Sequence, residues 1–266
     1  MKRFSFNHAT ATRWPLPEML DACVNAGVQT VGLWREQTAE YGLSRTIAHL
    51  ETTGLAVSSM CRGGFFANDG WYDDNRRAID ETAAVGAPVL VLVCGGLAPG
   101  QRDLAGARAH VADAIGQLVP YAQERNVRLA IEPLHPMFAS DRCVVSTLEQ
   151  ALDIAESYPL DAVGVVVDTY HIWWDERVFE QIERAGPRIA SFQLADWVTP
   201  LPAGVLTGRG LPGTGCIDFS RFWRAVDDAG YAGPVEVEVF NDALWDRPGV
   251  SVLTDTIAAY KSVRIS

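Results

Sequence analysis

Four side chains with a ligating oxygen stand near the ends of apolar, β-branched runs in the second half of the chain. They are Glu132 in LAIEPLHP, Asp168 in VVVDTYH, Gln193 in SFQLADW and Glu238 in VEVEVF. The neighbours along each run are apolar, so we expect the four polar groups to point into a common interior. Three carboxylates brought together without a cation would repel one another, and burial would add to the cost.

A divalent metal ion would remove this repulsion. Ligands that are all oxygen suit a hard ion, Mn²⁺ first and then Mg²⁺, with Co²⁺ or Zn²⁺ as further options. The alternative is that each residue is a structural polar group satisfied by loop amides and ion pairs. For any one residue alone that alternative is the better one, whereas four such residues on successive strands favour the metal.

The whole chain alternates between short strands and helical segments. Strands are predicted over 4–8, 30–34, 56–60, 88–94, 128–132, 163–168, 189–193 and 235–240. Because helices separate them, the strands must run parallel, and eight such units favour a closed (β/α)8 barrel as a single domain over 1–266. The first run, FSFNHATATRW, contains no glycine, unlike the phosphate loop of an open doubly wound sheet. A barrel places its active site at the carboxyl ends of its strands, where the four residues fall.

Capping residues predict where several helices begin and end. Gly27 should end the first helix, Ser146 should cap the helix that follows it, and Asp218 and Gly230 should bound another. A further helix is predicted within 102–126. The buried stripe of the first helix should consist of Met19, Leu20, Cys23 and Val24.

Parity along the strands extends the prediction below the four residues. Arg128 and Glu132 are an even number of residues apart on one strand, as are Glu236 and Glu238 on another. Arg128 and Glu236 should therefore point into the barrel at a deeper level than the two glutamates of the site. We expect an Arg128–Glu236 ion pair there, although a bulge that exposes one partner is an equal alternative.

Composition narrows the class of protein. The 266 residues include 22 Lys and Arg against 33 Asp and Glu, for a net charge of −11, and no basic block is present. Such a chain should repel nucleic acid. Its five cysteines have no CxxC spacing, and neither a secretory signal nor a membrane-spanning run is recognisable, so a cytoplasmic protein without membrane contact is expected. The oligomeric state stays open, with a homo-oligomer as one option.

Taken together, the motifs IEPLHP, VDTYHIWWD, FQLADW to RGLPGTGCID and VEVEVFN resemble the sugar-phosphate isomerase/epimerase family with the xylose-isomerase-like barrel. The resemblance covers essentially the whole chain. That group includes ketose 3-epimerases, hydroxypyruvate isomerase and inosose isomerases and dehydratases, and more remotely endonuclease IV.

The resemblance implies roles for particular positions. Glu132, Asp168 and Glu238 match metal ligands, and the two glutamates also match the proton-transfer pair of the family. His171 and Arg209 match residues that contact substrate oxygens. Most ketose epimerases of this kind have histidine where this chain has Gln193, whereas members similar to hydroxypyruvate isomerase have glutamine, and the amide makes Zn²⁺ less suitable.

Five further residues are candidates for substrate contacts. His8, at the end of the first strand, either faces the pocket or is a hydrogen-bonded structural residue. His135 is expected to shape the pocket rather than to do chemistry. Arg35 and Arg62 follow the second and third strands and could hold a carboxylate or phosphate. Trp174 belongs to an aromatic wall that suits a sugar face, or else to ordinary packing.

The leading hypothesis is an isomerase or epimerase of carbohydrate metabolism. It would move a proton on a ketose or other hydroxy-carbonyl substrate through a metal-bound enediolate, with Glu132 and Glu238 as the acid and base and His171 orienting substrate oxygens. The main alternative is a lyase that eliminates from the same enolate, similar to inosose dehydratase or to a glycoside-cleaving enzyme. A non-catalytic binding protein and a nuclease similar to endonuclease IV rank behind both.

Overall fold

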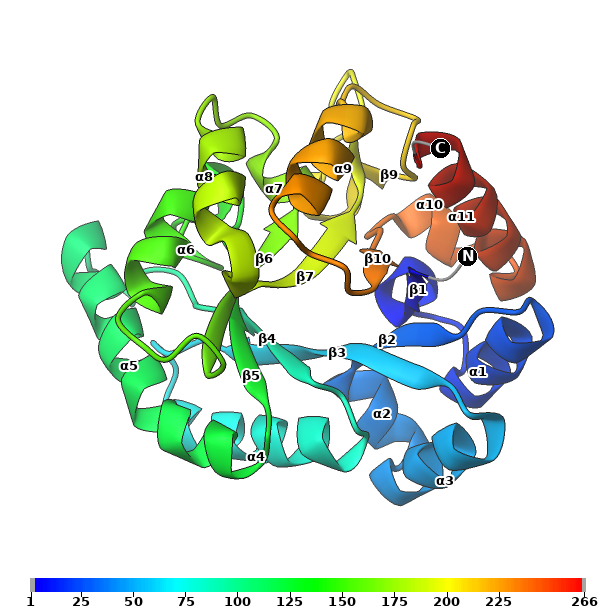
Figure 1. Ribbon diagram of the computed structural model, residues 1–266, viewed down its shortest axis with the longest axis horizontal. Coiled ribbons are helices and arrows are strands. Elements are labelled where there is room, and N and C mark those ends of the chain that lie inside the picture. Colours follow the sequence, from blue (N-terminus) through cyan, green and yellow to red (C-terminus); the bar gives the residue numbers. More distant parts are fainter. Residues whose placement is uncertain (1–2, 265–266) are drawn as a thin grey trace.

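A closed barrel of eight parallel strands forms the centre of the computed structural model, which describes residues 3–264 (Figure 1). Its strands are β1 (Phe4–Asn7), β2 (Thr30–Trp34), β3 (Ala56–Gly64), β4 (Val89–Val93), β5 (Arg128–Ile131), β6 (Val163–Asp168), β7 (Ile189–Leu194) and β10 (Val235–Val237). Each is hydrogen-bonded to the next around the ring, and β10 pairs with β1 to close it. The predicted (β/α)8 barrel is therefore confirmed, with all eight strands at the predicted runs.

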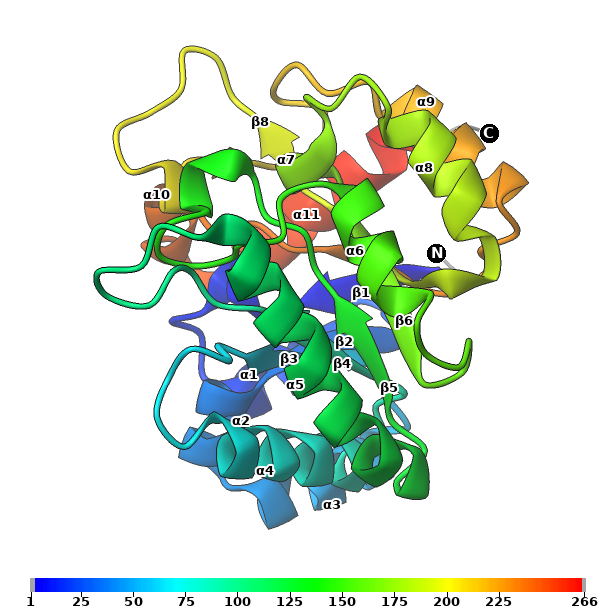
Figure 2. The same cartoon turned by 90° about the vertical axis from the view of Figure 1, so that its left-hand side faces the viewer.

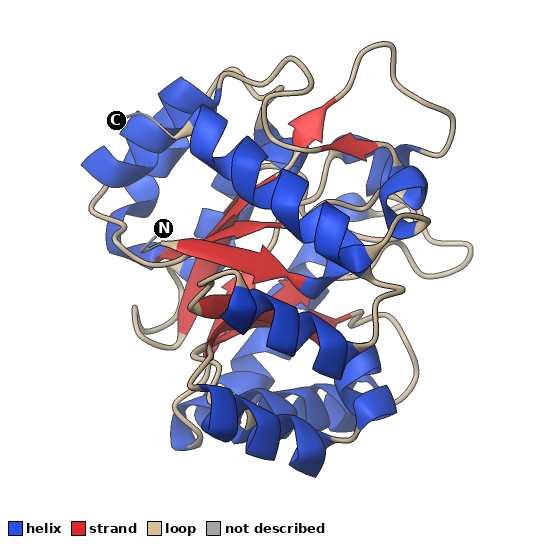
Figure 3. Cartoon of the chain, turned by 90° about the vertical axis from the view of Figure 1, so that its right-hand side faces the viewer, coloured by secondary structure: helices blue, strands red, loops and turns tan. Residues whose placement is uncertain are grey.

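Helices surround the barrel (Figure 3), and they follow one another around it in the order in which they occur in the chain (Figures 1 and 2). They are α1 (Leu16–Asn25), α2 (Arg35–Tyr41), α3 (Leu43–Thr53), α4 (Trp71–Ala84), α5 (Leu104–Glu124), α6 (Leu148–Ala155), α7 (Thr169–Ile172), α8 (Val178–Ala185), α9 (Phe219–Asp228), α10 (Asp242–Trp245) and α11 (Gly249–Val263). Short 3-10 helices are η1 (His8–Ala11), η2 (Pro136–Phe138), η3 (Gly186–Arg188) and η4 (Val205–Thr207). The last helix, α11, packs against α1 and so completes the ring. No helix within the described residues is long and apolar enough to cross a membrane.

The predicted helix ends are largely confirmed. Asp218 caps α9 by accepting from the backbone N–H of Arg221. The N-cap of α6 is Thr147 and not Ser146, because the Thr147 hydroxyl is the group that accepts from the Gln150 N–H. The predicted stripe of α1 is buried except for Val24, which is 39% exposed and lies beyond the face that meets the barrel.

Two apolar regions hold the fold together. The larger one lies between the strands and the surrounding helices and includes residues of both. The smaller one consists of strand residues alone and fills part of the barrel interior, with Cys61, Val89, Val91, Ala130 and Val166. This separation is the usual arrangement of a (β/α)8 barrel, whose interior is filled by side chains.

Polar groups occupy the opposite side of the barrel interior. Asn7 Nδ2 donates to Glu236 Oε2 at 2.8 Å, and Trp34 Nε1 donates to Asn7 Oδ1 at 2.9 Å. Gly32 is required beside this group, because a Cβ there would collide with the Glu236 carboxylate. Burial raises the pKa of Glu236, and the hydrogen bond from Asn7 opposes that rise.

The predicted Arg128–Glu236 pair is wrong. Arg128 Nη2 instead donates to the carbonyl oxygen of Pro187 at 3.0 Å, at the end of the barrel where β5 begins. Glu236 is satisfied by Asn7, so no ion pair between the two forms within residues 3–264. Alternation along a strand predicts the side on which a side chain leaves the backbone. It does not predict the direction in which a long arginine side chain then extends.

Candidate active site

The four oxygen-bearing residues lie together at the carboxyl end of the barrel. Glu132 and Glu238 directly follow β5 and β10, Asp168 ends β6, and Gln193 lies in β7. These strands are consecutive neighbours in the ring, and Asp168 is the register partner of Gln193. Each of the four is buried, with Glu132 the most exposed at 4%. The structure therefore brings the predicted set into one interior space.

Backbone hydrogen bonds hold the two glutamates in place although each lies just beyond its strand. The N–H of Glu132 donates to the carbonyl oxygen of Leu92 at 3.1 Å, and that of Glu238 donates to Leu194 at 3.2 Å. The barrel ladder thus continues through both residues. Their side chains are presented from rigid backbone, as proton transfer at a fixed substrate atom requires.

Arg209 supplies the positive charge within this group. Its Nη1 lies 3.3 Å from Asp168 Oδ2 and 3.3 Å from Glu238 Oε2. The guanidinium also lies over the rings of Tyr170 and Phe240, at 4.9 and 4.5 Å from their centroids. The family resemblance implies that Arg209 contacts substrate oxygens. The structure adds that its guanidinium is the counter-ion of the Asp168 and Glu238 carboxylates.

One guanidinium does not neutralise three carboxylates. Burial raises the pKa of Glu132 well above its usual range, and the charge of Glu238 raises it further. Burial likewise raises the pKa of Glu238 to about 8, although Arg209 opposes the change. The pKa of Asp168 is also raised by burial. Without another cation Glu238 therefore favours its protonated form at neutral pH, and raised pKa values of this kind are typical of carboxyls that act as an acid or a base.

Several buried polar atoms of the site have no hydrogen-bond partner among the described residues. They are Glu132 Oε1, Glu238 Oε1 and both terminal atoms of Gln193. Burying an oxygen atom without a hydrogen-bond donor is costly. Carboxylate and amide oxygens are the ligands that hard divalent cations prefer. The residues therefore fit a divalent metal ion.

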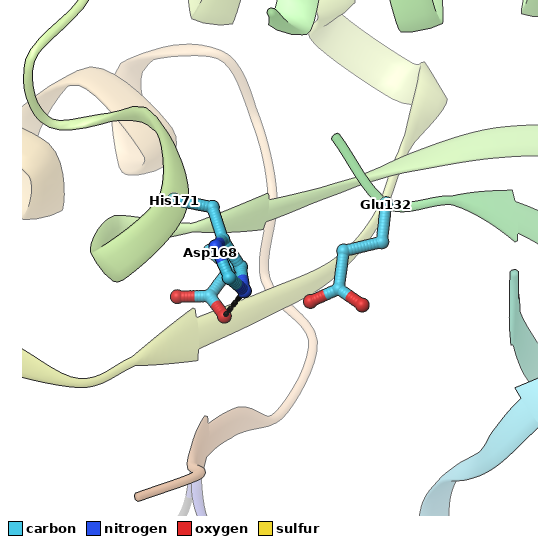
Figure 4. A group of neighbouring side chains, drawn as sticks. All are labelled: Glu132, Asp168 and His171. Carbon is cyan, nitrogen blue, oxygen red and sulfur yellow. Dashed lines mark ion pairs between the residues drawn. The ribbon is translucent and has the colours of Figure 1, made fainter. Parts of the chain in front are cut away.

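His171 joins this set in an unexpected way. Figure 4 shows the Glu132 and Asp168 carboxylates lying near each other with the His171 ring beside Asp168. One ligating atom from each of the three residues lies within 4.8 Å of the others, a spacing that could hold a metal ion. The sequence had predicted His171 as a catalytic residue that contacts substrate oxygens and not as a ligand, so the geometry adds it as a candidate ligand.

The protonation of His171 follows from its contacts. Its Nδ1 lies 3.2 Å from the backbone N–H of His135, its Nε2 lies 3.1 Å from Arg209 Nη2, and Asp168 Oδ2 is 3.8 Å from Nε2. Burial lowers the pKa of His171 well below its usual range, and the charge of Arg209 lowers it further. The ring is therefore neutral near pH 7, and it can accept only one of the two nearby donors at a time.

Aromatic rings line one side of the mouth. His135 lies 4.9 Å from the Trp197 ring and 5.6 Å from the Trp174 ring, measured between centroids. Trp174 is 37% exposed, yet its Nε1 donates to the His171 carbonyl oxygen at 2.8 Å, which fixes the indole. The predicted aromatic wall thus includes a ring that is both anchored and open to solvent.

The remaining predicted contacts differ in their surroundings. The Arg35 guanidinium forms ion pairs within the protein, with Nη1 3.1 Å from Asp74 and Nε 2.5 Å from Glu81. These pairs give Arg35 a structural role, because its donors already bind carboxylates. Arg62 lies at the rim, and its guanidinium stacks 4.3 Å from the Phe65 centroid. His8 is buried in η1, and its Nε2 lies 2.8 Å from the Trp14 carbonyl oxygen.

A buried aspartate that the sequence analysis did not select holds the segment that carries Arg209. A two-stranded antiparallel sheet, β8 (Asp196–Trp197) with β9 (Arg209–Gly210), was also not predicted. Asp196 accepts hydrogen bonds from the backbone N–H groups of Trp197, Gly213, Gly215 and Ile217, at 2.7 to 3.1 Å. The sequence offered one sign of this role, which is a glycine-rich turn shortly after an isolated aspartate. The backbone N–H groups of such a turn need an acceptor, and the aspartate can supply it.

Comparison with known proteins agrees with the barrel fold. The family model described as Xylose isomerase-like TIM barrel matches residues 20–262. A 3-dehydroshikimate dehydratase of Pseudomonas aeruginosa is 31% identical over 251 residues, which is 88% of this chain and 37% of that protein. An inosose isomerase of Bacillus subtilis is 32% identical over 132 residues, covering 48% of this chain and 45% of the isomerase. The chain thus matches less than half the length of either curated relative.

A solved structure extends the similarity over the full chain. The crystal structure of protein SMc04130 from Sinorhizobium meliloti superposes with a TM-score of 0.96 at 40% sequence identity. The match covers 100% of this chain and 99% of that one. The barrel and its surrounding helices are therefore shared from end to end.

Proposed function

The chain belongs to the xylose isomerase-like TIM barrel family, and on this premise we propose that it is a sugar isomerase or epimerase. Its reaction would be proton transfer at the carbon beside a carbonyl group of a small polyhydroxylated substrate. The observation that carries the proposal is the pair of buried glutamates, Glu132 and Glu238, which stand at the carboxyl ends of β5 and β10 beside Asp168, each with one oxygen that has no partner among the described residues.

The two glutamates have complementary tasks. With a cation in the site both carboxyls would be ionised at the start, since added positive charge favours the charged form. One glutamate would remove the proton beside the carbonyl, and the other, after taking a proton from solvent, would return it to the carbon framework. Return to the opposite face of the same carbon gives an epimer, and return to the neighbouring carbon gives an isomer.

Glu132, Asp168, Gln193 and Glu238 would hold a divalent metal ion, with His171 as a further candidate ligand. When bound, such an ion supplies Lewis-acid polarisation of a carbonyl oxygen, and Mn²⁺ is our first choice for this oxygen-rich set.

The other polar residues would orient the substrate. Arg209 would donate to a substrate oxygen from its position beside Asp168 and Glu238. His171, being neutral, would donate or accept at Nε2 without adding charge. Trp174 offers an anchored flat surface for the apolar face of a sugar ring. We place this activity in the cytoplasm, since the five free cysteines suit a reducing compartment.

Dehydration is a second candidate. It is favoured by the dehydratase of Pseudomonas aeruginosa, which aligns with 88% of the chain, whereas the inosose isomerase aligns with 48%. The first step is the same removal of a proton beside the carbonyl. The electron pair then forms a carbon–carbon double bond, the β-carbon–oxygen bond breaks, and the departing hydroxyl takes a proton to leave as water.

Elemental analysis after reloading with Mn²⁺ tests the site. We expect close to one equivalent of metal in the wild type and a sharp loss in Glu238→Gln. The exposed Glu51→Gln serves as the control, since it makes the same change at the surface. Absence of bound metal from the wild type would refute the site as proposed.

Incubation in deuterated water separates the two reactions. A panel of ketoses, inososes and 3-dehydroshikimate would be added to the Mn²⁺-loaded protein and followed by mass spectrometry. Isomerisation or epimerisation incorporates deuterium into a product of otherwise unchanged composition, whereas dehydration removes one water. A loaded protein that does neither on any member would count against an enzyme of this type.

A further inference from the structure

Two arginines lie at the rim of the barrel on the arc of β3, β4 and β5, the strand that Glu132 follows. Arg62 lies near the end of β3, and Arg142 lies in the loop after β5. That loop is fastened to the site, because Cys143 Sγ lies 3.6 Å from the Glu132 carbonyl oxygen and the Val144 N–H donates to Gly95 at 2.9 Å. Since β3, β4 and β5 are adjacent, the two arginines belong to the same arc of the rim.

Neither arginine has a close carboxylate partner. Arg142 is half-buried, its Nε is fully buried without a hydrogen bond, and its side chain makes no ion pair or hydrogen bond within residues 3–264. The Nε of Arg62 is likewise buried and unpartnered, and its nearest carboxylate, Glu36, is 3.9 Å away. By contrast, the partly buried Arg35 pairs with two carboxylates.

This lack of partners is unusual in so acidic a protein. With 33 acidic residues against 22 basic ones, carboxylates are abundant, and an unpaired half-buried guanidinium carries a desolvation cost. Burial lowers the pKa of Arg142, and the positive charge of Arg62 lowers it further. The segments that carry the two arginines also meet, because Gly95 pairs with Cys143 and lies against Phe65, and an anion between the two cations would relieve both costs.

The orientation of Arg62 is fixed before any ligand arrives. Its guanidinium stacks on Phe65, and its carbonyl oxygen accepts from Arg35 Nη1 at 3.4 Å. Arg35 is in turn held by Asp74. A planar guanidinium held in this way recognises the two oxygens of a carboxylate, or the oxygens of a phosphate, through paired hydrogen bonds.

We propose that Arg62 and Arg142 bind an anionic group, a carboxylate or a phosphate ester, of the substrate whose carbonyl end faces Glu132. This inference rests on the proposed function for the position of the reacting carbon. It assigns the substrate to the acidic sugars, keto acids or sugar phosphates and excludes an uncharged ketose or inosose as the best ligand. Arg142 becomes a substrate-binding residue, and Arg35 becomes the positioning residue for Arg62.

Calorimetry with matched ligand pairs tests the proposal on the Mn²⁺-loaded protein. D-gluconate against D-glucitol forms the carboxylate arm, and D-fructose 6-phosphate against D-fructose forms the phosphate arm. In at least one arm the anionic member should bind about tenfold or more tightly than its neutral partner. The preference should fall below about threefold in Arg142→Gln and in Arg62→Gln, with affinity for the neutral member unchanged. The exposed Arg224→Gln, which removes the same charge from α9, should keep the wild-type preference.

Three results would overturn the proposal. They are equal affinity within both pairs, a loss in the arginine variants that affects charged and neutral members alike, and no binding of either anion up to about 10 mM. Because the readout is binding, it does not depend on turnover. Retention of one metal equivalent by both variants separates failure of this inference from failure of the metal site.

Discussion

Replacing Glu238 with glutamine is expected to stabilise the metal-free protein above neutral pH. The wild-type carboxyl lies among Asp168, Glu132 and a single counter-ion, Arg209. Glutamine has nearly the same shape, keeps an oxygen toward the guanidinium and carries no charge. It also removes one of the negative charges that raise the pKa of Glu132.

The size of the effect follows from the shift in pKa. Burial raises the pKa of Glu238 from 4.5 to about 8, so the folded state holds this proton more tightly than the unfolded state. The contribution of this carboxyl to the free energy of unfolding is therefore fully present below its pKa in the unfolded state. It is lost as the pH rises toward its pKa in the folded state. Between pH 6 and pH 8 this one group costs the wild type about 2 kcal/mol, and the glutamine variant avoids that loss.

Urea denaturation of chelator-treated protein at pH 6 and pH 8 measures the difference. The wild type should lose stability between the two values by roughly 2 kcal/mol more than the variant does. Glu51→Gln, an exposed substitution, should follow the wild type. Saturating Mn²⁺ should flatten the wild-type profile, because the added charge favours the ionised carboxyls. An equal pH dependence in wild type and Glu238→Gln would refute the account of the buried carboxyls.

Three further predictions concern the surroundings of the site. Asp196→Ala should lower the free energy of unfolding by about 2–4 kcal/mol and expose the turn over 210–217 to proteolysis, because four backbone N–H groups lose their acceptor; an intact turn by proteolysis would contradict this. Gly64→Ala should cost about 3 kcal/mol or more in urea denaturation, because φ is +103° and a Cβ would meet the Val93 carbonyl, whereas Gly86→Ala, with positive φ but open space, should cost about 1 kcal/mol. Gln193→His should shift metal preference toward Zn²⁺ by about tenfold in competition with Mn²⁺, since imidazole is the softer ligand.

The barrel could be predicted because its determinants are local. Each strand is a short apolar run bounded by polar or turn residues, and helical spacing fills the gaps between runs. Eight such repeats leave few topologies other than a closed barrel. Since the ring order follows chain order, placing Glu132, Asp168 and Glu238 at strand ends was enough to predict that they lie together.

The failures involve groups whose partners are distant in sequence or whose side chains are long. Arg128 donates to the Pro187 carbonyl oxygen, whereas the Glu236 carboxylate accepts from Asn7, and neither partner is close in sequence to the residue it binds. Arg35 was open to a ligand on sequence grounds, whereas the acids that occupy it lie on α4, outside any local pattern. Arg142 drew no attention because a lack of partners becomes visible only in three dimensions.

The residues proposed for proton transfer and metal binding lie in different parts of the fold from those proposed to contact the rest of the substrate. Glu132, Asp168 and Glu238 are part of the barrel ladder or directly bonded to it. His135, Arg142 and Trp174 lie in connecting segments outside the strands. Insertions and substitutions in those segments leave the strand pairing intact, so a duplicated gene could acquire a new substrate while inheriting the proton chemistry unchanged. In such a lineage, specificity diverges first and reaction type later.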